Sequence, residues 1–113
     1  MNLHSVLANM QKERKIPISK TELYDQGITS LEDIPIKAKL FNPTGRGTWY
    51  VAAYYPNERI AYGYVSLFGD WNDEWGDFSI DELQGFQGPF GVGIEVDLFF
   101  TPCLAKDIIT KMS

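Results

Sequence analysis

The feature that most constrains the fold of this chain is a series of three strand-like segments separated only by short turns. These segments either alternate apolar and polar residues or are rich in aromatic and β-branched residues, and they cover residues 36–41, 48–55 and 59–68. Proline and glycine mark the turn at 42–47, and proline begins the turn at 56–58. Because neither connection is long enough for a crossover helix, the segments are predicted to pair as an antiparallel meander.

Helices are predicted before this sheet. The apolar residues that recur at helical spacing near the N-terminus are Leu3, Val6, Leu7 and Met10. Pro17 then prevents easy continuation of that helix. Residues 19–26 and 30–33 are each predicted to form a further short helical segment.

The second half of the chain predicts two helices and one more strand. A capping box of the form Ser-x-x-Glu begins at Ser79 and predicts a short helix to about residue 84. The alternation of residues 94–100 predicts a strand, and Thr101 followed by Pro102 predicts the start of a final helix. The fold class is therefore α+β, with a small antiparallel sheet of about four to five strands and short helices at the N-terminus, after the acidic loop and at the C-terminus.

Length and composition favour one folded domain. The chain has 113 residues, of which 44% are hydrophobic and 14% aromatic, more than a disordered acidic segment would carry. We expect a single domain over 1–113, with a helical N-terminal segment (1–35), a sheet-containing core (36–102) and a C-terminal helix (103–113). A single cysteine, Cys103, excludes an intramolecular disulfide and favours a cytoplasmic location. No apolar run approaches the ~18 residues of a membrane span, so we expect no membrane contact.

Charge is distributed unevenly along the chain. Between Arg59 and Lys106 there are eight carboxylates and no Lys, Arg or His. Such a stretch repels phosphate groups and attracts positively charged side chains. We therefore expect a basic protein surface as the partner and no direct binding of nucleic acid.

The segment Gly69 to Gly76 is predicted to be an acidic loop that contains two tryptophans. Tryptophan is favoured at interface hot spots, and acidic neighbours select a basic partner. The predicted interaction residues are Asp70, Trp71, Asp73, Glu74, Trp75, Asp77, Glu95 and Asp97. The alternative interpretation is a solvated turn whose tryptophans fold back onto the core.

Other chemistries stay open as alternatives, and no catalytic residue, metal ligand or cofactor is assigned. Counting from Asp70, Gly76 falls seventh rather than sixth, so the spacing does not match an EF-hand, although a looser divalent-cation site or a small hydrolase using clustered carboxylates remains an alternative. Cys103 near a helix start is either a reactive thiol or a small buried residue. The tyrosines of the predicted strands either stack bases or form an aromatic core.

Several ordered segments carry a resemblance to a known family. They are Lys39-Leu40-Phe41-Asn42-Pro43, Thr48-Trp49-Tyr50, Gly76-Asp77-Phe78-Ser79 with Glu82-Leu83, Gly88-Pro89-Phe90-Gly91, and Ile94-Glu95-Val96-Asp97-Leu98-Phe99-Phe100 with Pro102. Over about residues 39–102 the chain resembles the bacterial domain-of-unknown-function family 2958, and residues 1–30 are expected to lie outside the recognisable part.

The resemblance implies an accessory role in a mobile element, because similar proteins tend to be encoded on plasmids, integrative elements and phages, and it implies no established activity. The family often has arginine where this chain has Val96 and tyrosine where it has Asp77, so this chain is the more acidic. Our leading hypothesis is a non-catalytic interaction protein that presents its acidic, Trp-containing surface to a basic partner, and inhibition of a nucleic-acid-handling host protein is one version of it.

Overall fold

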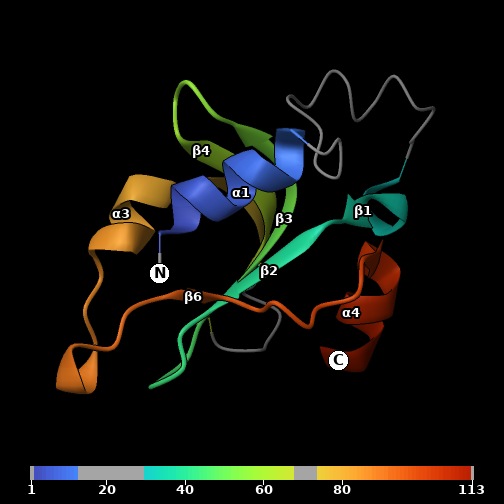
Figure 1. Cartoon of the computed structure of the whole chain (residues 1–113). Coiled ribbons are helices and arrows are strands. Elements are labelled where there is room, and N and C mark those ends of the chain that lie inside the picture. The colour runs from blue at the N-terminus through green and yellow to red at the C-terminus, as the bar shows by residue number, and fades with distance from the viewer. Residues whose placement is uncertain (1, 13–29, 68–73, 113) are drawn as a thin grey trace.

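A five-stranded antiparallel sheet forms the centre of the computed structural model, which describes residues 2–12, 30–67 and 74–112 (Figure 1). Its strands are β2 (Ala38–Phe41), β3 (Thr48–Tyr55), β4 (Ile60–Ser66), β5 (Glu74–Ser79) and β6 (Glu95–Val96). In the strand order β5-β4-β3-β2-β6, all neighbouring pairs are antiparallel. Strands β2 to β5 follow one another as the predicted meander, and β6 returns to pair with β2, so the α+β class is confirmed.

Short helices lie at both ends of the described chain, before β2 and after β5. They are α1 (Leu3–Lys12), α3 (Ile80–Gly85), α4 (Ala105–Met112) and the 3₁₀ turns η1 (Leu31–Asp33) and η2 (Pro89–Gly91). The capping box is confirmed in part, because the Ser79 hydroxyl accepts a hydrogen bond from the Glu82 N–H at 3.1 Å. The helix predicted over 19–26 lies outside the described residues. No helix in the described ranges is both long and apolar enough to span a bilayer.

The start of the last helix differs from the prediction. Cys103–Leu104 form β7, which pairs with β1 (Pro35–Ile36) in a separate two-stranded sheet. Helix α4 begins only at Ala105, whose N–H donates to the Ile34 carbonyl at 2.9 Å. The C-terminal helix is therefore confirmed, but its predicted start at Thr101 and Pro102 is wrong, because pairing with a distant strand outweighs a local start signal.

Both edges of the main sheet also differ from the prediction. The acidic loop was expected to extend to Gly76, but β5 begins at Glu74 and continues the ladder with β4. The strand predicted over 94–100 is only two residues long. It ends because Asp97 closes a turn, in which its side-chain Oδ1 accepts from the Phe99 N–H at 3.0 Å and its carbonyl accepts from the Phe100 N–H at 3.3 Å.

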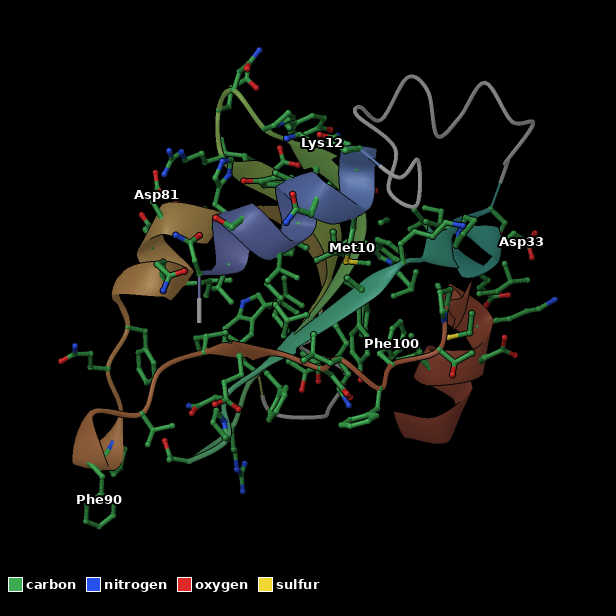
Figure 2. All side chains as sticks on the ribbon, viewed as in Figure 1. Met10, Lys12, Asp33, Asp81, Phe90 and Phe100 are labelled. Atoms are coloured by element: carbon green, nitrogen blue, oxygen red, sulfur yellow. The ribbon has the colours of Figure 1, made fainter. Side chains whose placement is uncertain are left out.

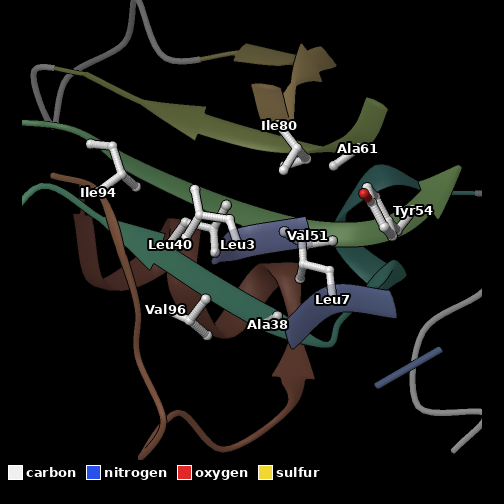
Figure 3. Packing of buried hydrophobic residues seen from close by; sticks show 10 residues of the cluster. All are labelled: Leu3, Leu7, Ala38, Leu40, Val51, Tyr54, Ala61, Ile80, Ile94 and Val96. Carbon is white, nitrogen blue, oxygen red and sulfur yellow. The ribbon is translucent and has the colours of Figure 1, made fainter. Parts of the chain in front are cut away.

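The sheet is buried on both faces. On one face, Leu3 and Leu7 of α1 and Ile80 of α3 pack against strand residues in one cluster (Figure 3). On the opposite face a second cluster joins residues of the main sheet to Ile34 after η1, Ile36 of β1 and Ala105 at the start of α4. Because α1 and α4 cover opposite faces, the two ends of the chain stabilise the same sheet.

A β-bulge in β3 decides which face each of its tyrosines occupies. The register between β3 and β4 shifts between Val51 and Ala53. One extra residue reverses the alternation of side chains beyond it. Tyr50 and Tyr54, which a regular strand would place on one face, therefore lie in opposite clusters, with Tyr54 on the face that α1 covers.

The bulge leaves room only for glycine at the facing position of β4. A Cβ atom on Gly63 would lie 1.7 Å from the carbonyl oxygen of Tyr50 and 3.2 Å from the Cα of Val51. Both neighbours are backbone atoms, so they can move only if the two strands separate.

Tyr54 of β3 links the sheet to α1 through hydrogen bonds. Its side chain is fully buried, and its hydroxyl shares a hydrogen bond with Nδ1 of His4. Its carbonyl accepts a hydrogen bond from Nε2 of Gln11 at 2.7 Å. The N–H of Leu3 donates to Oε1 of Gln84 at 2.6 Å, which ties α1 to α3 as well.

Alkaline pH is expected to destabilise the protein through Tyr54. Burial raises the pKa of this phenol, the charge of Asp81 raises it further and the charge of Arg59 lowers it. A raised pKa means that the folded state favours the neutral phenol. The contribution of Tyr54 to the free energy of unfolding is therefore fully present below the unfolded pKa of about 10 and is lost as pH rises through the folded pKa. In urea unfolding at neutral pH, the free energy of unfolding of Tyr54→Phe should be about 1 kcal/mol lower than that of the wild type, because the hydrogen bond to His4 is lost. Between pH 10 and 11, the free energy of unfolding of this variant should fall less steeply with pH than that of the wild type. Parallel slopes above pH 10 would contradict this assignment.

Candidate interaction surface

The predicted interaction residues are distributed over both edges of the sheet. Asp70, Trp71 and Asp73 lie outside the described residues. Glu74, Trp75 and Asp77 belong to the edge strand β5, Glu95 to the opposite edge strand β6, and Asp97 to the turn after it. Four strand spacings separate the two edges, which is about 19 Å. Asp77 therefore lies at one edge of the sheet and Glu95 and Asp97 at the other, so these three carboxylates do not form one acidic surface.

Trp75 is part of an aromatic layer on the sheet. Its side chain is half-buried, and its ring centroid lies 5.9 Å from that of Tyr62 and 5.6 Å from that of Tyr64. The layer continues through Tyr50, which contacts the rings of Tyr64 at 6.3 Å and Phe100 at 6.4 Å. Part of the Trp75 surface thus packs within the fold, as in the alternative interpretation of the tryptophans.

The buried tyrosines of this layer do not offer exposed ring faces on which nucleic-acid bases could stack. Tyr50 and Tyr62 are buried, with 9% and 6% of their surface exposed, and Tyr54 lies on the other face of the sheet. Stacking requires exposed ring faces. The described tyrosines thus fit the aromatic-core interpretation.

Basic side chains from outside the acidic stretch lie close to two of its carboxylates. Nζ of Lys39 lies 4.0 Å from Oδ2 of Asp97, and Nη1 of Arg59 lies 3.3 Å from Oδ1 of Asp81. Such partly exposed pairs contribute little to stability, but they reduce the local negative charge. The count along the sequence therefore overstates the charge that a partner would meet at these two positions.

The turn at Asp97–Phe100 holds two large apolar side chains in solvent. Leu98 is 70% exposed and Phe99 is 95% exposed, whereas Phe100 packs against Tyr50. We call Leu98 and Phe99 the anchor turn. The backbone of this turn is fixed by the two hydrogen bonds to Asp97, so the pair is held outward by a defined conformation.

Sequence reasoning did not identify the anchor turn, because it assigned Leu98 and Phe100 to one face of a strand. The sequence nevertheless contained an indication of a turn at these residues. Leu98, Phe99 and Phe100 are consecutive and bulky, so a strand would place at least one of them opposite the others, and the preceding Asp97 is a turn-forming residue.

A second exposed aromatic residue lies at the tip of the loop after α3. Phe90 is fully exposed, and Figure 2 shows its side chain pointing away from the rest of the fold. Its φ of 62° lies in the left-handed region and is followed by Gly91 at φ 73°. Phe90 and the anchor turn lie on either side of β6 in the chain.

An open cleft of about 200 Å³ lies between α3, this loop and β6. Its lining residues are Gln84, Phe86, Gln87, Gly91, Gly93, Ile94 and Glu95. Glu95 is the only ionisable side chain among them, so the cleft does not bring together a pair of carboxylates for acid–base chemistry.

The described residues were also compared with the arrangements that a metal ion or a reactive thiol requires. Over 2–12, 30–67 and 74–112, no three His, Cys, Asp or Glu side chains are arranged to hold a metal ion. Cys103 is half-buried in β7 rather than in the first turn of a helix. The reason for expecting a reactive thiol at a helix start is therefore removed.

The fold defines a small α+β protein whose meander sheet carries helices on both faces. The chain belongs to the family described as protein of unknown function (DUF2958), which it matches over residues 4–108. This match extends beyond 39–102 at both ends, so the expectation that residues 1–30 lie outside the family was wrong from residue 4 onward. The packing of α1 on the sheet gives a physical reason, because Leu7 belongs to the same core as the strands. No curated protein and no solved structure matches the chain.

Proposed function

We propose that this protein is a non-catalytic interaction module of a mobile element, which acts in the cytoplasm by binding a basic protein surface. Covering that surface would inhibit a nucleic-acid-handling protein of the host. The mobile-element part rests on the family resemblance, and the basic partner rests on the acidic stretch. The observation that carries the interaction itself is the anchor turn.

Two adjacent apolar side chains that are exposed to solvent indicate a binding surface, because in that position they contribute little to the stability of the fold. A single exposed apolar residue is ordinary, but Leu98 and Phe99 are consecutive, and they are 70% and 95% exposed. Their turn is already ordered, so a partner that buries them pays little additional conformational entropy. A few residues that a partner buries at the centre of an interface commonly provide most of its binding energy.

The surroundings of the anchor turn favour a basic partner. Glu95 precedes the turn and residues 60–105 contain no Lys, Arg or His, although Asp97, which begins the turn, lies 4.0 Å from Nζ of Lys39. Carboxylates at the rim of an apolar anchor select partners of opposite charge and accelerate their association. This proposal therefore places the contact at the β6 edge, with Glu74, Trp75 and Asp77 at the β5 edge as a separate surface.

Affinity capture from the native host tests this proposal. The double variant Leu98→Ser/Phe99→Ser should lose the basic partner that the wild-type protein recovers, with affinity reduced roughly thirtyfold if the pair contributes about 2 kcal/mol. Recovery should also fall as salt rises, because surface charges are screened.

Phe90→Ser is the matched control, since it removes an equally exposed phenylalanine from a different turn. It should recover the same partner as the wild type. The proposal would be abandoned if the double variant recovered that partner undiminished, if Phe90→Ser lost it equally, or if the partner were acidic.

A further inference from the structure

Each polar group of Asp97 has a partner within the fold. Its N–H donates to the Lys39 carbonyl at 2.8 Å, and its carbonyl accepts from the Phe100 N–H at 3.3 Å. Its Oδ1 accepts from the Phe99 N–H at 3.0 Å, and its Oδ2 lies 4.0 Å from Nζ of Lys39. Both carboxylate oxygens are therefore engaged by the chain itself before any partner binds.

These contacts combine two kinds of turn at the same residues. The bond from the Phe100 N–H to the Asp97 carbonyl closes a four-residue β-turn, in which Leu98 and Phe99 occupy the two central positions. The bond from the Phe99 N–H to the Asp97 side chain is an Asx-turn, which favours the same course of the backbone. The carboxylate of Asp97 thus acts directly on the conformation of the two exposed apolar residues.

Both ends of the anchor turn are fixed to the sheet. At one end, Asp97 continues the pairing of β6 with β2 through its bond to the Lys39 carbonyl. At the other end, the ring of Phe100 lies 6.4 Å from the ring of the buried Tyr50. With its ends fixed, the short segment between them depends on the Asx-turn for a single conformation.

We infer that Asp97 is a positioning residue for the anchor turn and that its charge does not contact the basic partner. The inference rests on the proposed function, because that partner is the one that the anchor turn binds. It gives Asp97 a different role from the charge contact expected from the sequence. A turn that is ordered before binding loses less conformational entropy when a partner buries it, so Asp97 raises affinity through Leu98 and Phe99.

An asparagine variant separates the position of Asp97 from its charge. Asp97→Asn keeps a side-chain oxygen that can form the Asx-turn, but it removes the negative charge and the ion pair with Lys39. Asp97→Ala removes the oxygen as well as the charge. In quantitative capture from native-host lysate, Asp97→Asn should bind the basic partner like the wild type. Asp97→Ala should bind it about three- to tenfold more weakly, which is the usual effect of one lost hydrogen bond.

Nitrogen-15 relaxation NMR of the full chain measures the order of the turn without any partner. The backbone order parameters of Leu98 and Phe99 should be near the rigid value of about 0.85 in the wild type and in Asp97→Asn, and should fall below about 0.6 in Asp97→Ala. Asp81→Ala is the matched control, since it removes an aspartate that also pairs with a base, and it should leave both order parameters unchanged. If Asp97→Ala is poorly folded, Asp97→Ser should give intermediate values, because a hydroxyl forms this turn more weakly.

The outcomes separate this inference from the proposed function. Equal weakening by Asp97→Asn and Asp97→Ala would show that the partner reads the charge, and would overturn the positioning role. Undiminished partner binding by Asp97→Ala, or order parameters that match those of the wild type, would overturn it as well. If the wild-type protein recovered no basic partner, the proposed function would fail, whereas the order parameters would still decide whether Asp97 positions the turn.

Discussion

Gly63→Ala is expected to destabilise the protein by about 3 kcal/mol or more, because among the described glycines the closest approach of an added Cβ occurs at Gly63. The added Cβ would lie 1.7 Å from the Tyr50 carbonyl oxygen, a distance that only separation of β3 and β4 can relieve. Separation breaks hydrogen bonds between two central strands and disturbs the bulge that sends Tyr54 to the α1 face. Urea unfolding monitored by circular dichroism measures the loss, as a lower midpoint with an unchanged slope.

Gly76→Ala provides a closely matched control. Gly76 lies directly opposite Gly63 in the β4–β5 register, but its added Cβ would meet nothing within 4 Å. Its substitution should leave stability unchanged or raise it by up to about 1 kcal/mol, because alanine restricts the unfolded chain. Similar midpoints for the two variants would show that the close approach at Gly63 is not a constraint.

Leu7→Ala is expected to cost about 3 kcal/mol by opening a cavity between α1 and the sheet. Leu7 is fully buried in the cluster that includes Leu3 and Val51 (Figure 3). Removing a buried leucine side chain loses its transfer free energy and leaves a space that the neighbours fill only partly. For a domain whose total stability is roughly 5–15 kcal/mol, this is a large fraction.

Leu98→Ala is the corresponding control, because it removes the same atoms from a side chain that is 70% exposed. It should change the free energy of unfolding by less than about 0.5 kcal/mol. If Leu7→Ala were equally mild, α1 would not be packed on the sheet under the conditions of the measurement. Urea unfolding of the double variant Leu98→Ser/Phe99→Ser, measured in the same way, separates a loss of partner binding from a folding defect.

The candidate surface was predicted only in part from the sequence. Glu95 and Asp97 were selected for their charge, and both lie beside the anchor turn. The exposed apolar pair was missed because alternation was assumed to continue past Asp97. The cleft could not be predicted, since it joins the end of α3 to β6 across a loop whose path no local pattern specifies.

The sequence by itself determined the features that depend on neighbouring residues. Side-chain period and turn residues identified the meander, and the Ser79 hydroxyl caps α3 as its motif predicts. Only the tertiary structure decided that Cys103 pairs as a strand with Ile36, that the bulge sends Tyr54 to the α1 face, and that Asp77 and Glu95 lie on opposite edges. The physical reason is that strand order and register are set by backbone pairing and core packing between residues far apart in the chain, whereas periods, turns and caps are set within a few residues.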